Sequence, residues 1–408
     1  MKGSKTIADL LSVAQDYSRL QSCPNCHSPE LKPFHELLGI PANSCLLFDE
    51  RHEAIDCPKS DIILTHCRNC DFVFNAAFDP SQMEYSGRYE ETQGFSEIFG
   101  QFHRQLAADL IERHDLRGRN VMEIGCGKGE FLVLLSQLGG NRGVGVDPSA
   151  LPERLAGVDG AKRVVLIPEY FTPEHCRPEP DFLCCKMTLE HITDTASFIS
   201  TVRGGLSAEK GAIVFFQVPE AHRIFKECAF EDIYHEHCSY FTEDSLSYLF
   251  ESCGFRVSRI THEYGDQYLT IEAVADASVP IGDVVVRPTR LSPLVDSFSQ
   301  RIADKQLYWR KIVENSNESG QQVVIWGSGS KAVSFLTTLG VSEMVHFVTD
   351  INPNRHGYFM PGTGHKIVPP SELSKLGPSL VIAMNRIYHD EIRDMLDGIV
   401  DDYQLRCL

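Results

Sequence analysis

A short glycine-rich loop is the feature that most constrains the fold of this chain. The loop directly follows an apolar stretch, Asn120–Ile124, and directly precedes a helical one. Its glycines permit a tight turn and let a ligand approach the backbone N–H groups at the start of the helix. Asp147 lies eighteen positions after the last glycine, at the end of the next apolar stretch. This arrangement is typical of the nucleotide-binding edge of an α/β sheet. The glycines are Gly125, Gly127 and Gly129, and Glu123 lies just before the turn.

The alternation of apolar and helical stretches divides the 408 residues into three predicted domains. A chain of this length can bury two or three separate cores. Residues 1–90 are rich in Cys, Pro and Asn with short strand-like pieces at Asp61–Thr65 and Phe72–Phe74, as in a small domain that needs a metal or a disulfide. Residues 91–275 alternate helices with strands, as an open α/β sheet does. Its expected strands are Asn120–Ile124, Arg142–Val146, Asp181–Cys185, Ala212–Val218 and Tyr268–Val274.

Residues 276–408 are predicted to form a second, smaller α/β domain. Ala275–Pro293 contains three prolines and no sustained period, so we expect a linker there. The stretch Leu294–Glu314 has a helical pattern. The remaining expected elements are strands at Gln322–Trp326, Val345–Thr349 and Leu380–Met384 and a helix at Lys331–Leu339.

Charge and cysteine usage indicate the compartment and the kind of partner. The chain has 38 basic and 56 acidic side chains, a net charge of −18, which opposes binding to nucleic acid or to an anionic membrane. A small-molecule substrate is therefore predicted. The first twenty residues mix polar with apolar positions as in an amphipathic helix, unlike a secretory signal. The fourteen cysteines are spread along the chain, as in a reduced, cytoplasmic protein, which is the predicted location.

Four cysteines have the spacing of a metal site. Two CxxC pairs lie about forty residues apart and together offer a tetrahedral set of four thiolates, which suits zinc. Because four protein ligands leave no position for water, the ion is expected to be structural. Chance cysteines or redox pairs are the alternatives, and Cys45, Cys57, His27 and His66 are nearby substitute ligands. The predicted ligands are Cys23, Cys26, Cys67 and Cys70.

The glycine loop by itself is compatible with NAD or with S-adenosylmethionine (SAM). The ExGxGxG loop, the following Gly145-Val-Asp147 and a strand that leads into Thr188-Leu-Glu190-His191 together resemble the class I SAM-dependent methyltransferases. The resemblance implies that SAM is the cofactor. The expected cofactor-binding residues are Glu123, Gly125, Gly127, Gly129 and Asp147.

The segment from Tyr234 to Phe241 concentrates titratable side chains. It holds two histidines, a carboxylate and two tyrosines within eight residues, and groups packed this closely can trade protons. Glu236 is expected to orient or charge a histidine and so to tune a general base. The alternatives are a solvent-exposed loop or a metal site formed by His235 and His237, for which the sequence offers no third ligand at a supporting spacing.

The whole chain resembles the sugar C-methyltransferases of deoxysugar pathways in antibiotic biosynthesis. The resemblance is carried by the four-cysteine set, by the YHEHxxYF string at Tyr234–Phe241, and by Trp326–Lys331, Asp350–Pro353 and Pro361–Thr363 in the C-terminal region. It implies a class I methyltransferase Rossmann-like domain flanked by a small zinc-binding domain and a C-terminal Rossmann-like α/β domain.

The resemblance also implies a mechanism. His237 is the expected general base, assisted by Glu236 and Tyr234, while His191 and a tyrosine of the Tyr85–Tyr89 segment, assigned as Tyr89, line the sugar pocket. In that family the acceptor is a 4-keto-6-deoxysugar linked to a nucleotide diphosphate. A ketone acidifies the neighbouring C–H group, so a tuned base can produce an enolate whose carbon accepts the methyl group.

The chain departs from the family pattern at several positions. Lys186 and Met187 replace an Asn-Asn pair, and Asn385–Tyr388 differs from the usual Trp-Asn. Two alternative functions therefore stay open. One is methyl transfer to oxygen or nitrogen of a sugar or another small metabolite. The other is a zinc-containing binding protein that has lost catalysis, which the intact Glu123 and Asp147 argue against.

A second glycine loop, Val323–Gly329, precedes a helix, and Asp350 ends the following strand like a ribose-binding acid. This pattern predicts either a dinucleotide site or a loop that only turns the chain and helps to close the substrate cleft. The second reading is favoured because methyl transfer has no use for a redox cofactor. Lys331, Arg355 and Lys366 are candidates for contact with a substrate diphosphate.

Overall fold

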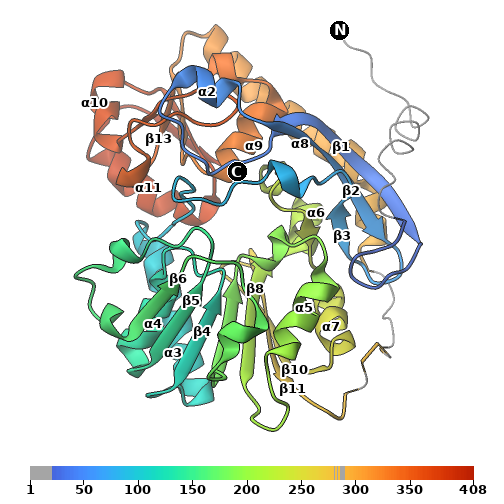
Figure 1. Cartoon of the computed structure of the whole chain (residues 1–408). Helices are drawn as coiled ribbons and strands as arrows, with labels where there is room; N and C mark the ends of the chain where they lie inside the picture. The colour runs from blue at the N-terminus through green and yellow to red at the C-terminus, as the bar shows by residue number, and fades with distance from the viewer. Residues whose placement is uncertain (1–20, 280, 283, 285–289) are drawn as a thin grey trace.

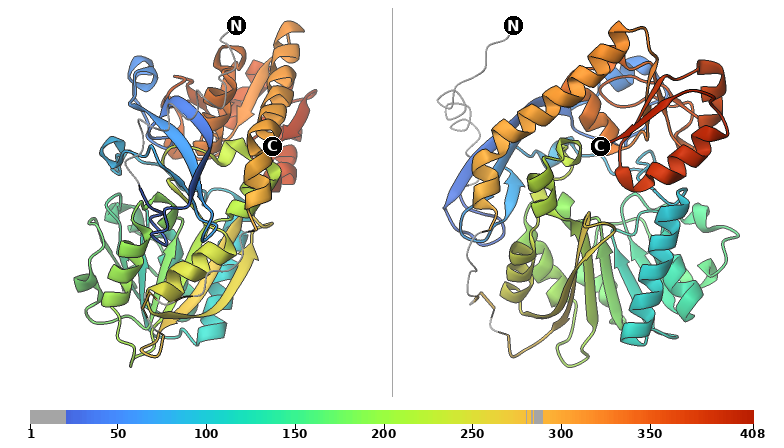
Figure 2. Two further views of the ribbon diagram at one scale, coloured as in Figure 1. Left: turned by 90° about the vertical axis from the view of Figure 1, so that its right-hand side faces the viewer. Right: turned by 180° about the vertical axis from the view of Figure 1, so that it is seen from behind.

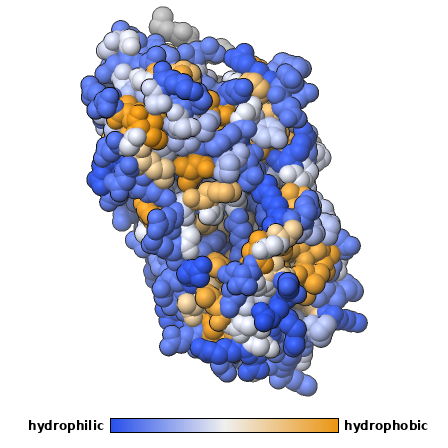
Figure 3. All heavy atoms as spheres, turned by 90° about the vertical axis from the view of Figure 1, so that its left-hand side faces the viewer, coloured by the Kyte–Doolittle hydropathy of each residue, from blue (hydrophilic) through white to orange (hydrophobic). Residues whose placement is uncertain are grey.

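The computed structural model describes residues 21–279, 281, 282, 284 and 290–408. The N-terminal amphipathic stretch and part of the predicted linker lie outside these residues. Figure 1 shows three sheets, with four, seven and five strands, arranged around the centre of the molecule. In the described part of the chain, no helix is both long enough and apolar enough to cross a membrane. Figure 3 shows one face on which hydrophobic side chains form separate patches between hydrophilic ones.

The seven-stranded sheet has the order β10-β11-β8-β7-β4-β5-β6 and lies in the lower half of Figure 1. The strands from β4 to β8 are parallel, and β11 pairs antiparallel with both β8 and β10. The predicted strands are confirmed to within one residue at either end. The bounds are β4 Asn120–Ile124, β5 Arg142–Val146, β6 Val164–Ile167, β7 Phe182–Lys186, β8 Ile213–Pro219, β10 Phe255–Glu263 and β11 Tyr268–Ala275.

Alternate residues of this sheet face two different layers of helices. Val121 and Phe182 pack with α3 and α4, whereas Met122 and Leu183 pack with α5 and α7. Strands buried on both faces are mostly apolar, which is why the sequence pattern located them well. The helices are α3 Glu97–His114, α4 Glu130–Gly139, α5 Thr195–Gly204 and α7 Glu243–Ser252.

The four-stranded sheet is antiparallel, with the order β1-β2-β3-β9. Its fourth strand comes from residues 239–240, far beyond the predicted boundary at residue 90, and pairs with β3 through Val73 and Tyr240. The segment with the clustered histidines therefore runs directly into the N-terminal sheet. The elements are β1 Leu31–Pro41, α2 Arg51–Ile55, β2 Lys59–Cys67, β3 Val73–Asn75 and β9 Ser239–Tyr240.

The five-stranded sheet is parallel, with the order β14-β13-β12-β15-β16. The predicted helix before it is real but longer, since α8 has 27 residues. Figure 2 shows α8 running from the N-terminal sheet to the C-terminal one. The elements are α8 Ser292–Glu318, β12 Val323–Trp326, α9 Ser330–Leu339, β13 Phe347–Thr349, β14 Ile367–Val368, α10 Leu373–Leu376, β15 Leu380–Ala383, α11 His389–Asp397 and β16 Gln404–Cys407.

One hydrophobic core joins all three predicted domains. It includes Leu64 of β2, Phe225 of α6 (Ala221–Glu227), Phe298 of α8 and Phe335 of α9. Full burial of one side chain of this size contributes roughly 1.5–3 kcal/mol to stability. The three sheets are therefore held against one another around the residues that form the candidate site.

Candidate active site

The predicted glycine loop joins β4 to α4 in a conformation that requires glycine. Gly125 has φ 66°, and a Cβ atom there would lie 1.9 Å from Oγ1 of Thr188. Oδ2 of Asp147 accepts a hydrogen bond of 2.9 Å from the N–H group of Gly127, and its other oxygen accepts from the N–H group and the hydroxyl of Ser149. The predicted acid thus lies against the predicted loop, at the carboxyl ends of neighbouring parallel strands.

Glu123 is buried beneath this loop with an unused hydrogen-bond acceptor. Its side chain is on the sheet face covered by α3 and α4, and its Oε2 atom has no hydrogen-bond partner. Burial raises the pKa of Glu123 to about 7, with Lys186 acting in the opposite direction. Lys186 lies 3.1 Å from Nε2 of His103 and 4.0 Å from the ring centroid of Phe131. The lysine that replaces the expected asparagine therefore belongs to the cofactor side of the sheet.

The second group of predicted residues lies between the short helical turn Phe230–Asp232 and β9. The hydroxyl of Tyr234 and Nε2 of His237 are 2.8 Å apart, and Nδ1 of His237 has no partner. Burial lowers the pKa of His237 well below its usual value, nearby His191 lowers it further, and Asp232 opposes this shift. His237 is consequently neutral at neutral pH and can accept a proton.

Glu236 is engaged by groups other than His237. Its carboxylate accepts hydrogen bonds from the hydroxyl of Ser44 and, at 3.0 Å, from the hydroxyl of Tyr89. Burial raises the pKa of Glu236, and the bonds from Ser44 and Tyr89 oppose the shift. From the sequence, Glu236 was predicted to orient or charge a histidine. In the structure that contact with His237 is made by Tyr234, and Glu236 instead ties the segment to the N-terminal region.

His191, which belongs to the methyltransferase domain, lies next to His237. It follows β7, its Nδ1 lies 3.1 Å from the hydroxyl of Tyr85, and its ring centroid is 5.0 Å from that of His237. Burial lowers the pKa of His191 to about 4. Tyr85 and Tyr89, whose ring centroids are 5.3 Å apart, both belong to the segment that the sequence singled out.

Glu190 was quoted in the sequence motif but given no role. Oε1 of Glu190 lies 3.9 Å from Nε2 of His237, and neither carboxyl oxygen has a hydrogen-bond partner. Its position directly before His191 was a usable signal, because both residues follow the same strand.

Two readings of the histidine segment are not supported. The prediction of a solvent-exposed loop is wrong, because His235, Glu236 and His237 are all buried. His235 does not face His237 as a co-ligand would, since its ring stacks on Phe78 at a centroid distance of 4.8 Å.

The four predicted metal-ligating cysteines converge. The Sγ atoms of Cys23 and Cys70 are 3.8 Å apart and those of Cys26 and Cys67 are 3.5 Å apart, and all four sulfur atoms lie within 4.8 Å of one another. Sulfur atoms around a tetrahedral zinc ion, each about 2.3 Å from the metal, are separated by similar distances. Cys45 and Cys57 lie outside this cluster.

The second glycine loop is filled by the protein's own side chains. Both the N–H group and the hydroxyl of Ser328 bind Oδ2 of Asp350. The guanidinium group of Arg355 donates to the carbonyl oxygen of Ser328 at 3.1 Å and also to that of Glu90. Arg355 is therefore a structural link within this loop and not a diphosphate ligand, and Lys366 is exposed elsewhere, next to β14. These contacts support the reading in which the loop turns the chain.

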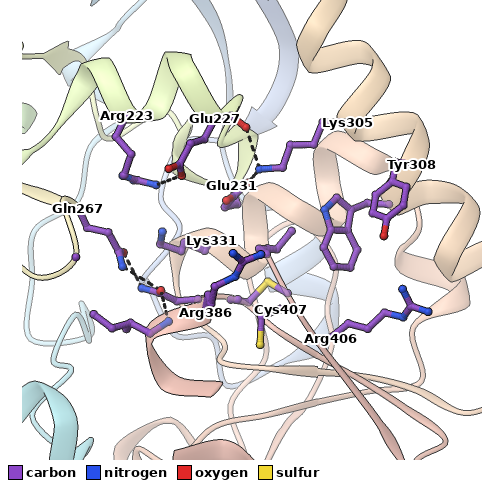
Figure 4. A pocket seen from close by; sticks show the side chains of 16 residues that line it. Arg223, Glu227, Glu231, Gln267, Lys305, Tyr308, Lys331, Arg386, Arg406 and Cys407 are labelled. Carbon is purple, nitrogen blue, oxygen red and sulfur yellow. Dashed lines mark hydrogen bonds and ion pairs between the residues drawn. The ribbon is translucent and has the colours of Figure 1, made fainter. Parts of the chain in front are cut away.

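A cavity of about 870 Å³ lies between the methyltransferase sheet and the C-terminal region. Figure 4 shows side chains from α6, α8, α9 and the ends of β15 and β16 pointing into it. Lys331 pairs with Asp232 at 2.7 Å, which connects this cavity to the segment that carries Tyr234 and His237. The basic side chains that line it are Arg223, Lys305, Lys331, Arg386 and Arg406.

Comparison with known proteins assigns both α/β regions. Residues 95–260 match the model of a methyltransferase domain, and residues 290–403 match the C-methyltransferase C-terminal domain. The chain is 28% identical to the C-methyltransferase NovU of Streptomyces niveus over 352 residues, which is 80% of this chain and 81% of that protein. These matches support a divergent member of the C-methyltransferase family. It is a SAM-dependent methyltransferase with a class I fold.

Two solved methyltransferase structures each match less than half of this chain. The magnesium protoporphyrin IX methyltransferase of Synechocystis PCC 6803 is 16% identical, covers 44% of this chain and 84% of its own length, and has a TM-score of 0.35. The 1,6-didemethyltoxoflavin-N1-methyltransferase of Burkholderia thailandensis is 17% identical, covers 44% and 81%, and also has a TM-score of 0.35. Likeness at this level says nothing about the acceptor.

The glycine loop fits SAM on two observations. Glu123 keeps a buried oxygen without a partner, and Gly125 and Gly127 turn the chain at positive φ angles with Thr188 and Glu91 packed where a Cβ atom would lie, so the loop has no side chains of its own at these positions. Asp147, the predicted acceptor for ribose hydroxyls, lies directly after β5 and next to this loop. When bound, SAM supplies an electrophilic methyl group.

The first prediction concerns this loop. Asp147→Ala should weaken SAM binding about tenfold or more, because a hydrogen bond to a charged group is worth roughly 1.5–3 kcal/mol. Isothermal titration calorimetry with SAM measures the change. Asp159→Ala, at an exposed position in the same domain, is the matched control and should bind normally. Equal affinity in the two variants would remove Asp147 from the site.

Proposed function

We propose that the enzyme methylates a carbon next to the ketone of a sugar linked to a nucleotide diphosphate. The observation that carries the proposal is the buried, neutral imidazole of His237, held by Tyr234 and facing the residues that follow β7. A base can remove a proton from carbon only in its unprotonated form, and burial shields the resulting carbanion from water. Membership of the C-methyltransferase family supports the same chemistry.

Each residue of the cluster has a distinct task in this proposal. His237 takes the proton from the carbon, and the hydroxyl of Tyr234 fixes the ring of His237 at 2.8 Å. Glu236 holds Tyr89 in place, while His191 and Tyr85, joined at 3.1 Å, form the wall of the sugar pocket. Because these side chains are largely buried, the enolate that forms among them is protected from protonation by water.

The neighbouring cavity suits the nucleotide diphosphate. Five basic side chains line it, and they outnumber the acidic residues Glu227 and Glu231. Cationic groups gathered in one cavity bind phosphate oxygens through charge-assisted hydrogen bonds. Tyr308 of α8 also lines the cavity and, because its side chain is exposed, offers an aromatic face for a nucleobase. Of the three basic residues suggested by the sequence, Lys331 alone reaches this cavity.

The second prediction tests the base. His237→Gln should slow methyl transfer by about 10²–10⁴-fold, the usual contribution of a general base, while SAM affinity stays the same because His237 lies outside the glycine loop. The exchange of the acceptor's α-hydrogen in D₂O, followed by mass spectrometry, reports proton removal separately from methyl transfer. His262→Gln, at a surface position, is the control. Normal exchange in the His237 variant would contradict the proposal.

We further propose that Cys23, Cys26, Cys67 and Cys70 hold one structural zinc ion. The cysteines pack in the same core as Leu246 of α7, and the amide of Asn25 donates to the carbonyl oxygen of Ser245 at 3.1 Å. The ion would therefore hold the N-terminal region against the methyltransferase domain, and it has no open position for chemistry.

The third prediction follows from this packing. Purified protein should contain one zinc ion per chain by plasma mass spectrometry, and Cys67→Ser should lower the Tm by about 10 °C or more, since a structural zinc ion contributes folding free energy. Cys57→Ser is the matched control, because Cys57 is buried in the same region outside the cluster. Metal-free protein with an unchanged Tm would argue against a zinc site.

A further inference from the structure

Glu190 is a buried acid that the proposed mechanism leaves without a task. It lies in the short helical turn Leu189–His191 after β7, and its side chain is 1% exposed. Neither of its carboxyl oxygens has a hydrogen-bond partner. A buried polar group without a partner is costly, so such a group in a stable fold is expected to meet a ligand.

The unpartnered carboxyl group faces the catalytic histidine. Oε1 of Glu190 lies 3.9 Å from Nε2 of His237, and donor atoms of Glu190, His191 and His237 lie within 4.8 Å of one another. The separation is too long for a hydrogen bond between Glu190 and His237. Both side chains keep atoms without a partner, namely the two carboxyl oxygens of Glu190 and Nδ1 of His237, which remain free to meet an acceptor.

The environment pushes the pKa values of the two groups in opposite directions. Burial raises the pKa of Glu190 to about 8, whereas burial and nearby His191 lower the pKa of His237 well below its usual value. At neutral pH the carboxyl group is protonated and the imidazole is neutral. Opposite shifts of this kind distinguish an acid from a base in one site. The other titratable groups that interact electrostatically with this pair are Tyr85, Cys185, Asp232, Tyr234, Cys238, Tyr268 and Lys331.

We propose that Glu190 is a second catalytic residue, which binds the ketone oxygen of the acceptor through its protonated carboxyl group while His237 takes the proton from the neighbouring carbon. The inference rests on the C-methylation proposed above. The ketone oxygen and the reacting carbon are separated by two bonds, so an acid and a base on neighbouring elements can serve both. A protonated carboxylic acid in an apolar site is an effective donor to a developing enolate.

Atoms and electrons balance in the proposed methyl transfer. The C–H bond breaks and its proton goes to His237, while the electron pair moves to the oxygen that Glu190 hydrogen-bonds. The enolate carbon then forms a bond to the methyl group as the S–CH₃ bond of SAM breaks, which leaves S-adenosylhomocysteine and the restored ketone. Glu190 keeps its own proton, and His237 later releases the transferred one to solvent. No oxidant or further reactant is required.

The pH dependence of kcat tests this inference. At saturating SAM and acceptor, kcat of the unmodified enzyme should fall as pH rises through about 8, because Glu190 then loses the proton it donates. Glu190→Gln keeps an N–H donor that does not titrate. We expect it to lower kcat by about 10–100-fold at pH 7 and to abolish this falling limb. Glu190→Asp should retain the limb with a reduced rate.

A matched control separates the catalytic effect from the loss of a buried acid. Glu272 of β11 is also buried, but it pairs with Arg113 and His114 on the far side of the sheet. Glu272→Gln should leave the shape of the pH profile unchanged. Circular dichroism and SAM titration establish that each variant is folded.

Three results would overturn the inference or its basis. A normal rate and pH profile in Glu190→Gln, with C-methylation intact in the unmodified enzyme, would remove Glu190 from catalysis. A second metal ion per chain, beyond the proposed zinc and lost in Glu190→Gln, would make Glu190 a metal ligand instead. If the unmodified enzyme neither exchanges the α-hydrogen nor methylates carbon, the proposed function itself fails.

Discussion

The burial of the Glu236 carboxylate is the interaction on which the site depends. Its oxygens accept from Ser44 and Tyr89, and the hydroxyl of Ser44 lies 2.7 Å from that of Ser330 at the start of α9. A buried carboxylate is tolerated only where donors surround it. Both donors come from the N-terminal region, so they surround Glu236 only when that region is docked against the methyltransferase domain, and Ser330 of the C-terminal region in turn contacts Ser44. The segment with His237 is thus held in its place by the assembled fold.

The docked C-terminal region also holds the backbone directly before Tyr234 in place. The hydroxyl of Ser334 on α9 donates to the carbonyl oxygens of Phe230 and Ile233, directly before Tyr234. The same helix supplies Lys331, which lines the cavity and pairs with Asp232. The segment from Asp232 to His237 therefore contacts the proposed nucleotide cavity at one end, through the pair of Asp232 with Lys331, and carries the proposed base at the other. The C-terminal region therefore contacts both the proposed nucleotide cavity and the segment that carries the proposed base.

The methyltransferase sheet could be predicted from sequence in most of its strands. Strands such as β4 and β7 are apolar on both faces, and Gly125 marks the turn by its need for a positive φ. Strands with an exposed face were not predicted: β1 carries His35 and Glu36 in its middle, and β10 alternates Arg256 and Arg259 with apolar residues. Period-two alternation with few apolar positions is a weaker signal than a continuous apolar run.

The partners of the site residues could not be predicted in the same way. The order of motifs placed Tyr234 and His237 together correctly, because their contact lies within one short segment. The partners of Glu236 are separated from it by 192 and 147 residues, and no local pattern encodes such contacts. The same applies to Glu190, which lies near His237 only because the fold brings the turn after β7 against the segment before β9. Spacing within a motif was informative, and contacts between motifs required the structure.

The position of the transferred methyl group tests the central claim most directly. The enzyme would be incubated with SAM labelled with ¹³C in its methyl group and with a panel of keto and hydroxy sugars linked to nucleotide diphosphates. The products would then be examined by carbon NMR. A signal in the aliphatic, carbon-bound methyl region with a keto sugar is the predicted result. A signal in the methoxy or N-methyl region would keep the SAM-dependent enzyme but contradict the enolate mechanism and the proposed roles of His237 and Glu190.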